Sequence, residues 1–305
     1  MIIDCHSHWL PEQIITNAHF YSQAWGDIES HLRMMDETGI DKAVLSYPTS
    51  DAHLKLGGLK ELSRIYNDNV SEILKRYPDR FIGAAILPVG KASDVLDELI
   101  RAIDELGFTA VSLASSYNGL YLDDPMFEKV YKNAQDYNIP VFIHPQTVNP
   151  IGYERVQDPL LTPVVEYIFD TAICIGKLMM SGVLMEYSDV HFVFSNFGGG
   201  MCSLFNRFDA TYEMLRGIDF VKDLKIPPSA LLKNIYVETS GDTLPANFQV
   251  ALETLGPSHI FWGSDWPAKK NVRESMQVIR DLPLGTADKE NILGNNLADF
   301  LTLQR

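Results

Sequence analysis

Short apolar segments alternate strictly with longer amphipathic segments along the chain, and this alternation limits the folds available to it. Eight segments have the length and the apolar, β-branched composition of buried strands: 2–6, 42–47, 81–88, 108–114, 140–144, 190–195, 235–240 and 260–264. Eight helical patterns follow them in turn: 28–38, 60–76, 92–106, 125–137, 163–184, 202–216, 244–255 and 287–303. Strands without a polar face are typical of a parallel sheet covered on both sides. The pattern therefore predicts an α/β fold, a single (β/α)8 TIM barrel.

The length of the chain fits one such barrel. It has 305 residues, and roughly 250 are enough to close a barrel of this kind. We find no internal repeat, low-complexity segment or Pro/Gly-rich linker, so we expect one domain over residues 1–305. An open, doubly wound sheet is the competing fold. It predicts a glycine-rich turn after the first strand, where this chain has His6-Ser7-His8.

Composition excludes several classes of function. The formal net charge is −15, and an acidic surface repels phosphate backbones, so we expect no nucleic-acid partner. No run approaches the roughly 18 apolar residues of a membrane span, and the first residues lack the pattern of a signal peptide. Cys5, Cys174 and Cys202 are an odd number at wide spacing, which favours no disulfide framework and a cytoplasmic location.

The first strand ends in two histidines that a strand would present together. Side chains alternate along a strand, so Asp4, His6 and His8 are expected on one face, with Cys5 and Ser7 on the other. If that face is the barrel interior, two imidazoles meet at the mouth with Asp4 one layer below. Neutral imidazole is the commonest metal ligand. By itself, however, a His-x-His pair is more often structural than metal-binding.

Two more residues of metal-binding type end later strands. His144 closes the fifth strand before a proline, and Asp265 closes the eighth. The carboxyl ends of barrel strands converge on one site, so His6, His8, His144 and Asp265 together predict a centre for one divalent metal. Three nitrogens and one carboxylate suit Zn²⁺ best, with Mn²⁺, Fe²⁺ or Co²⁺ as alternatives.

The sixth strand ends at Asn196, and glycines 198–200 follow it. The glycine run allows a close backbone approach to a bound group and a tight turn into the next helix. Arg207 follows on that helix, and its guanidinium is a candidate for binding a substrate carboxylate. A surface arginine paired with Asp209 is an equally good interpretation of the same residue.

With these residues in view, the chain resembles the branch of the amidohydrolase superfamily that contains aminocarboxymuconate semialdehyde decarboxylase and its hydrolase and hydratase relatives. The resemblance is carried by segments in the same order through the whole chain: IIDCHSHWLPE, RFIGAAILPV, NIPVFIHP, IYVETSG, IFWGSDWP and ILGNNLADFL. It implies a barrel, the same four metal ligands and a small acidic or carbonyl substrate. It also implies that Arg207 serves the site of a second subunit, in a homodimer.

Two positions bear on how far the family pattern applies. One concerns proton transfer, and the other concerns the number of metal ions. The family has histidine before the glycine run, where this chain has Asn196, and an amide cannot accept a proton near neutral pH. Asp265 is then the candidate for proton transfer beside the metal. The fourth strand has no lysine to bridge a second metal, so the resemblance favours one ion.

Three functions remain open. The first is metal-dependent hydrolysis through an activated water, assisted by Asp265. The alternative is non-oxidative decarboxylation of a small aromatic or muconate-type acid, in which the metal anchors a carboxylate or hydroxyl and Arg207 binds a second acidic group. The third is a binding protein that lost catalysis when Asn196 replaced the histidine.

Overall fold

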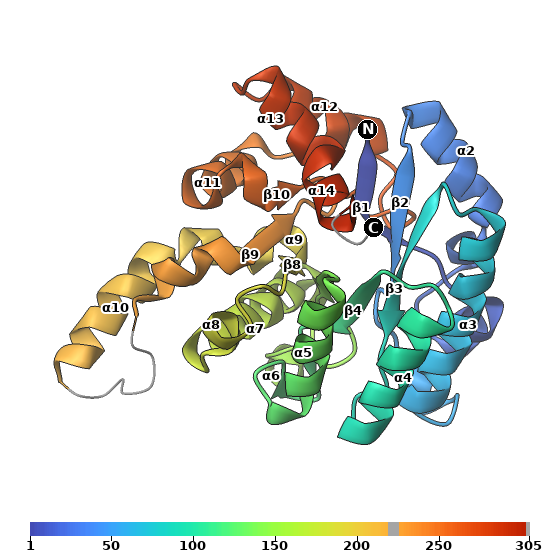
Figure 1. Cartoon of the computed structure of the whole chain (residues 1–305), viewed down its shortest axis with the longest axis horizontal. Coiled ribbons are helices and arrows are strands. Elements are labelled where there is room, and N and C mark those ends of the chain that lie inside the picture. The colour runs from blue at the N-terminus through green and yellow to red at the C-terminus, as the bar shows by residue number, and fades with distance from the viewer. Residues whose placement is uncertain (219–225, 303–305) are drawn as a thin grey trace.

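A barrel of eight parallel strands forms the centre of the computed structural model, which describes residues 1–218 and 226–302 (Figure 1). The strand order is β1-β2-β3-β4-β7-β8-β9-β10, and each neighbouring pair is parallel. The strands are β1 (Ile3–His8), β2 (Lys42–Ser46), β3 (Phe81–Ile86), β4 (Ala110–Ala114), β7 (Val141–His144), β8 (Phe192–Phe194), β9 (Ile235–Glu238) and β10 (Ile260–Phe261). The predicted fold class and the eight predicted strand positions are confirmed.

Backbone hydrogen bonds join the first and last strands of the barrel. The Cys5 amide donates to the Trp262 carbonyl (3.1 Å), the Asp265 amide to the His6 carbonyl (2.8 Å) and the His8 amide to the Trp266 carbonyl (2.7 Å). These bonds continue past the short β10 into the segment that carries Asp265. The two ends of the chain that supply candidate ligands are thus fixed directly to each other.

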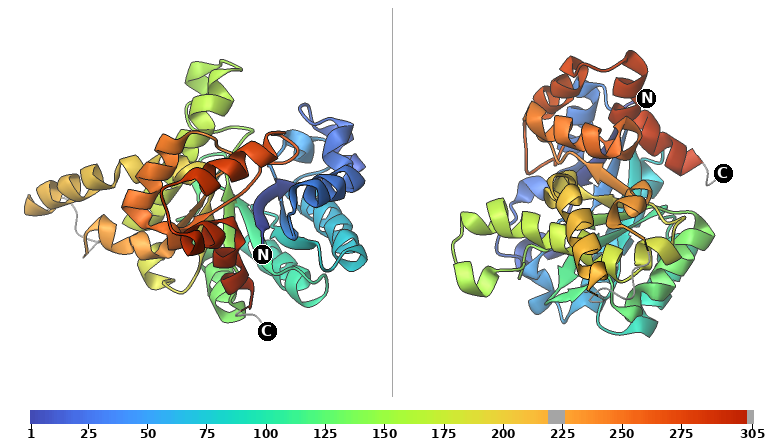
Figure 2. Two further views of the ribbon diagram at one scale, coloured as in Figure 1. Left: turned by 90° about the horizontal axis from the view of Figure 1, so that it is seen from above. Right: turned by 90° about the vertical axis from the view of Figure 1, so that its left-hand side faces the viewer.

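Helices surround the barrel, as the alternation predicted (Figures 1 and 2). The longer ones are α2 (Ile28–Thr38), α3 (Leu59–Arg76), α4 (Ala92–Asp104), α5 (Glu128–Tyr137), α7 (Tyr167–Met180), α10 (Phe205–Gly217), α11 (Pro245–Leu255) and α12 (Val272–Asp281). Shorter ones are α1 (Glu12–Asn17), α6 (Tyr153–Val156), α8 (Val183–Glu186), α9 (Ser195–Gly199), α13 (Thr286–Glu290) and α14 (Asn296–Thr302). A small hairpin, β5 (Ser116–Tyr117) and β6 (Leu120–Tyr121), follows β4. The sequence analysis missed α12, and the predicted helix 287–303 is two short helices joined by a π-helical turn.

Apolar side chains fill the lower part of the barrel. A buried cluster inside it takes alternate residues from neighbouring strands, and α14 adds side chains to it from the N-terminal end. Phe300 of α14 contacts the rings of Tyr236 and Phe261, at 4.7 and 5.2 Å between centroids. The bottom of the barrel is therefore closed by packing, and polar chemistry is confined to the opposite end.

A β-bulge in β1 changes which of its residues face inward. The pairing with β2 shifts register between Asp4 and Ser7, so Cys5 and His6 both face the interior, where they line one small cavity. Asp4 lies on the outer side instead, with Ser264 donating to its carboxylate through backbone and hydroxyl (2.8 and 2.5 Å). The predicted placement of Asp4 beneath the histidines is wrong, because one extra residue in the strand inverts the alternation.

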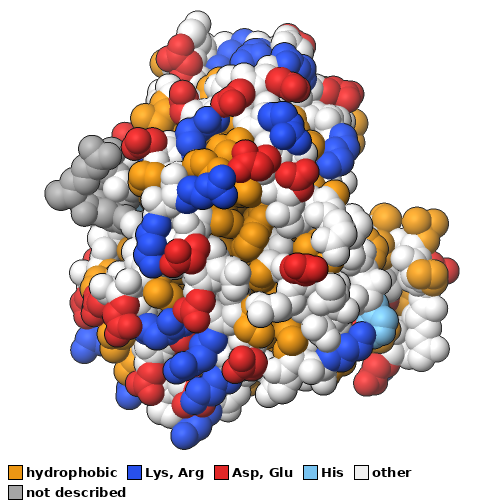
Figure 3. All heavy atoms as spheres, turned by 90° about the vertical axis from the view of Figure 1, so that its right-hand side faces the viewer, with side chains coloured by type: hydrophobic (Ala, Val, Ile, Leu, Met, Phe, Trp, Pro, Cys, Tyr) orange, Lys and Arg blue, Asp and Glu red, His pale blue; other side chains and the backbone are white. Residues whose placement is uncertain are grey.

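The surface over α2 to α4 carries acidic and basic side chains interspersed rather than separated into patches (Figure 3). Within the described part of the chain, no helix has the length and apolar character needed to cross a bilayer. All three cysteines are buried and none is bonded to another. The absence of a disulfide framework is therefore as predicted.

Buried His31 on α2 should make the fold sensitive to acid. It is 1% exposed, its ring packs edge-on against Phe81, and its nitrogens have no hydrogen-bond partner in the described structure. Burial, with smaller contributions from the charges of nearby cations, lowers its pKa from 6.5 to about 3. At pH values between about 3 and 6.5, the His31 ring is protonated in the unfolded chain and neutral in the folded chain. Stability from this residue is therefore lost as the pH falls below 6.5.

We expect His31→Leu to reduce the difference in the free energy of unfolding between pH 7 and pH 5. The parent should lose about 2 kcal/mol from this residue at pH 5, and the variant should not. Urea unfolding with a chelator present, at both pH values, measures the difference. Equal pH dependence in the two proteins would contradict the assignment.

Candidate metal centre

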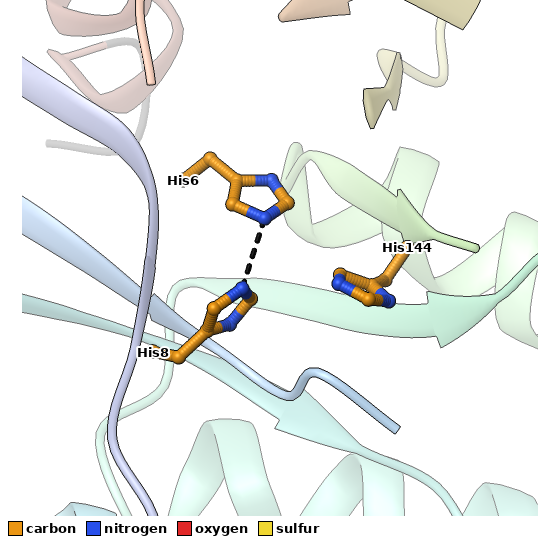
Figure 4. A group of neighbouring side chains, drawn as sticks. All are labelled: His6, His8 and His144. Carbon is orange, nitrogen blue, oxygen red and sulfur yellow. Dashed lines mark hydrogen bonds between the residues drawn. The ribbon is translucent and has the colours of Figure 1, made fainter. Parts of the chain in front are cut away.

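Three histidines meet at the C-terminal mouth of the barrel. His6 and His8 come from β1 and His144 from the end of β7, and their rings point toward one another (Figure 4). The Nε2 atoms of His6 and His8 are 3.0 Å apart, and each of the three residues places a nitrogen within 4.8 Å of the others. His6 and His8 are buried and His144 is half-buried. The structure thus brings together residues 136 positions apart in the sequence.

Each ring has its Nδ1 against an oxygen outside the cluster. His8 Nδ1 lies 3.0 Å from the Ser46 carbonyl and His144 Nδ1 lies 2.9 Å from the Pro145 carbonyl. Since a carbonyl can only accept, these Nδ1 atoms carry the proton and the Nε2 lone pairs are free. Burial keeps the pKa of both rings below the ordinary value. Neutral rings with converging lone pairs are the form that binds a metal.

Glu238, at the end of β9, plays the same part for His6. Its carboxylate lies 3.0 Å from His6 Nδ1 and is 1% exposed. It also accepts from the Asn196 amide and from the amide and hydroxyl of Ser240 (3.1, 2.6 and 2.6 Å). Burial alone would lower the pKa of His6, but Glu238 and then Asp265 outweigh it and raise the pKa to about 9. Sequence analysis missed Glu238, although it is the one acidic residue in an otherwise apolar strand.

Asp265 completes the cluster from the last strand. Its Oδ1 lies 3.3 Å from His8 Nε2 and 3.7 Å from His6 Nε2. Its backbone has φ 59°, a left-handed conformation in which Asp is one of the better-tolerated residues. Burial raises the pKa of the carboxyl, but the adjacent His8 ring and the positive charges of His6 and Lys269 lower it by more. Asp265 is therefore ionised, as a ligand must be.

The spacing of these atoms fits one divalent ion. Ligands at 2.0–2.1 Å from a metal lie roughly 3.0–3.4 Å apart in octahedral or tetrahedral geometry. The distances of 3.0 Å between the two Nε2 atoms and 3.3 Å from His8 to Asp265 fall in that range, and the 3.7 Å from His6 to Asp265 is slightly longer. His6, His8, His144 and Asp265 would hold the ion, and the spacing accommodates either zinc or manganese.

Gly263 allows β10 to approach β1 closely at this point. A Cβ there would lie 2.4 Å from the Cβ of His6 and 2.6 Å from a carboxylate oxygen of Glu238. Any larger residue would push apart His6 and the carboxylate that orients it. The glycine is therefore a requirement of the site and not of a turn.

The segment 9–27 covers one side of the cluster. Trp25 stacks on the ring of His8 at 5.6 Å between centroids, and Tyr21 packs edge-on against Trp25 at 4.6 Å. The segment 145–162 lies on another side. Its Thr147 hydroxyl is hydrogen-bonded to that of Thr49, and Asp170 of α7 accepts from its Ile151 amide at 2.8 Å. Both long connections that sequence analysis singled out thus lie at the mouth.

The two remaining predicted site residues, Asn196 and Arg207, lie in different parts of the structure. Asn196 stands at the rim after β8, half-buried, with φ 52°, and its amide is bound by Glu238 and Ser240. Arg207 is exposed on α10, a helix that projects from the barrel (Figure 2). Among the described residues no ion pair joins Arg207 to Asp209, whose carboxylate accepts from the Ser229 amide at 2.9 Å.

A second hollow of about 70 Å³ lies beside the centre, between the ends of β2 to β4 and helix α3. Ser112 lines both this hollow and the small cavity under the histidines. The walls are mostly apolar, with polar atoms from residues such as Tyr47, His53 and Gln146. The mouth therefore offers an uncharged space next to a strongly polar one.

Together these features define a metal-binding (β/α)8 barrel with one centre at the C-terminal ends of its strands. The amidohydrolase family model matches residues 3–303. The chain belongs to the amidohydrolase family, as the resemblance indicated.

Two relatives that are named as decarboxylases match most of this chain. Gamma-resorcylate decarboxylase of Rhodococcus jostii (strain RHA1) is 25% identical over 329 residues, covering 97% of this chain and 96% of its own. 2-Amino-3-carboxymuconate-6-semialdehyde decarboxylase of Dictyostelium discoideum is 26% identical over 245 residues, covering 80% and 67%. Among solved structures, dihydroxybenzoic acid decarboxylase of Polaromonas sp. JS666, with bound manganese and the inhibitor 2-nitroresorcinol, has a TM-score of 0.85 at 22% identity, covering 100% and 97%.

Removing the charge of Glu238 should weaken the metal centre without unfolding the barrel. In Glu238→Gln the side-chain NH2 group competes for the position facing His6 Nδ1, so the ring no longer holds its lone pair toward the ion. We expect metal affinity to fall roughly 10- to 100-fold, measured by competition with a chromogenic chelator. The matched control is Glu166→Gln, a buried glutamate (2% exposed) outside the cluster, which should keep the parent affinity. An unchanged affinity in Glu238→Gln would contradict the orienting role.

Proposed function

We propose that this protein is a divalent-metal-dependent decarboxylase that releases CO2 from a small hydroxylated aromatic acid. The observation that carries the proposal is the gathering of three imidazoles at the mouth of the barrel, with the Asp265 carboxylate 3.3 Å from His8 Nε2. Relatives at 25–26% identity over most of the chain are decarboxylases. These relatives support decarboxylation, which was the alternative in the sequence analysis, over the hydrolysis that was predicted first.

A bound ion would supply an anchor for the substrate's carboxylate or neighbouring hydroxyl and would draw electron density from the ring. A manganese ion in a solved protein of the same fold supports a hard divalent cation as well as the zinc predicted first. Each Nδ1 proton is held by an acceptor. The raised pKa of His6 leaves a second proton on that ring, and an ion held at the centre would displace it.

The reaction requires one proton to be delivered to carbon. The bond between the ring carbon and the carboxylate breaks, its electron pair stays on the ring carbon, and a proton is added there as CO2 leaves. No oxidant is needed. Asn196 cannot carry that proton, because an amide neither gains nor loses one near neutral pH. We assign the transfer to Asp265, whose carboxylate can take the proton of the substrate hydroxyl and return it to the ring carbon.

Aromatic side chains of segment 9–27 would exclude water from one side of the reacting group. Trp25 stacks on His8, and its backbone carbonyl accepts from the Leu10 amide at 2.9 Å. The Tyr21 hydroxyl is bound to backbone carbonyls of the segment after β2. An aromatic substrate over the metal would thus meet an aromatic wall already fixed in place.

Protein loaded with Mn²⁺ or Zn²⁺ should release CO2 from 2,6-dihydroxybenzoate, 2-hydroxybenzoate or a related acid. Removing the metal with a chelator should abolish turnover, and re-addition should restore it. Asp265→Asn should lower kcat by roughly 10²–10⁴-fold, measured as loss of substrate absorbance together with evolved CO2. Small lactones, esters and amides serve as the comparison set.

Two results would overturn the proposal. Hydrolysis of the comparison set by metal-loaded protein, without CO2 release from any acid, would favour the hydrolase. Inactivity toward both sets, with activity appearing only in Asn196→His, would favour a protein that has lost catalysis at this position.

We also propose that the protein forms a homodimer in which Arg207 reaches the partner's mouth. The segment from α6 into α7 exposes an unusual run of apolar side chains: Ile151, Tyr153, Val156, Leu160, Leu161, Val164 and Phe169. Contiguous exposed apolar surface of this kind is typical of a protein interface. This segment and α10 both project from the barrel, as a paired assembly would require (Figure 2).

Co-expressed Arg207→Ala and Asp265→Asn chains should recover activity that neither variant has alone. Random pairing gives one intact site per mixed dimer, so we expect about a quarter of the parent activity. Light scattering on the parent checks the dimer mass. A monomeric parent, or co-expressed chains no more active than the separate variants, would contradict the shared site.

A further inference from the structure

Lys269 lies at the rim of the metal centre and its side chain is fixed there. It follows Asp265 by four residues, and its amide donates to the Asp265 carbonyl at 2.8 Å. Its Nζ donates to the carbonyl of Ser240, after β9, at 2.6 Å. The side chain crosses from β10 to β9 over Gly241, where a Cβ would lie 3.1 Å from its Cδ. The ammonium group is thus held at the end of the strand that carries Glu238.

This half-buried cation has no carboxylate partner among the described residues. Arg101 is also half-buried, but it is paired with Glu98 and Asp68 at 2.7 and 2.6 Å. The Ser240 carbonyl takes one of the three donors of the ammonium group, and among the described residues no other hydrogen bond occupies the remaining two. Such an arrangement is typical of a site that receives its counter-ion from a ligand.

The charge balance of the centre gives Lys269 its importance. Three neutral histidines add nothing, and the carboxylates of Asp265 and Glu238 together offset the two charges of a divalent ion. Asn196, at the rim on β8, is an uncharged amide. Lys269 therefore adds a positive charge beside these carboxylates, in a protein whose formal charge is −15. Its charge also lowers the pKa of the Asp265 carboxyl.

We propose that Lys269 binds a second anionic group of the substrate, so that the site prefers aromatic acids with two acidic groups over those with one. This inference rests on the proposed decarboxylase function, because one carboxylate is placed at the ligands of β1, β7 and β10. The other is placed at the end of β9, where the ammonium group lies.

The test compares 2-hydroxybenzoate with 4-hydroxyisophthalate, which adds one carboxylate to the same ring. Metal-loaded parent should bind the diacid more tightly than the monoacid, by calorimetry. Lys269→Met should weaken binding of the diacid roughly 10- to 100-fold, the range for a hydrogen bond to a charged group. Binding of the monoacid should stay within about threefold. Lys269→Arg, which keeps the charge, should retain most of the preference.

Lys270→Met is the matched control. This neighbouring lysine is exposed and lies over the ring of Trp266 at 3.7 Å, away from Ser240. The Lys270→Met substitution removes the same formal charge as Lys269→Met, and it should leave the preference for the diacid unchanged. Metal content and melting temperature, measured for each variant, show that the centre and the fold are intact.

The role of Lys269 would be overturned if Lys269→Met weakened binding of both acids equally or of neither. It would also be overturned if Lys270→Met weakened binding of the diacid to the same extent, or if the parent did not bind the diacid. The proposed reaction is judged separately by CO2 release. A diacid that binds through Lys269 without releasing CO2 would refute the decarboxylase and leave this binding site standing. If CO2 release occurs and is unchanged in Lys269→Met, the decarboxylase proposal stands and the role of Lys269 is refuted.

Discussion

The metal centre depends on keeping three imidazole protons out of the space in which the lone pairs meet. Two of those protons are held by backbone carbonyls, of Ser46 and Pro145, and so follow from strand pairing and chain direction alone. The third is held by the side chain of Glu238. Closure of the barrel sets two ring orientations, and a single carboxylate on a neighbouring strand sets the remaining one. Substitution at that carboxylate is therefore the most direct way to alter the site without altering the fold.

Sequence reasoning identified the barrel and the four converging residues because both follow from simple periodicities. Alternating apolar strands and amphipathic helices predict the architecture, and parallel strands in a barrel bring their carboxyl ends together. The same reasoning placed Asp4 wrongly. The bulge in β1 falls between Asp4 and Ser7, and strand periodicity contains no signal for an inserted residue. His6 lies within the bulge and His8 follows it, and both face the interior. Strand alternation predicted this orientation without the bulge that produces it.

Residues that act through other residues were harder to find. Glu238 could have been noticed as a lone acid in a buried strand, since such a residue must have a partner. Its partner, His6, lies 232 positions away, and no local pattern connects them. Gly263 gives no signal at all, because its role is the close approach of two strands and not a turn. Helix α12 is a different case. Its buried residues recur at helical spacing, so the pattern that predicts the helix is present in the sequence, but the helix was not among the predicted elements.

The backbone at the ends of β8, β9 and β10 explains why chemistry gathers on that half of the mouth. Asn196, Ser240 and Asp265 all have positive φ, between 42° and 59°, a conformation that costs non-glycine residues of order 1–3 kcal/mol each. In each case the turn directs an amide or a side chain toward Glu238 or the histidines. The strain is maintained by the hydrogen bonds it makes possible, since the amides of Asn196 and Ser240 both donate to Glu238. The half of the mouth formed by β2 to β4 has an uncharged hollow instead. The barrel thus separates an ionic side, which would orient acidic groups, from an apolar side with room for the body of a ligand.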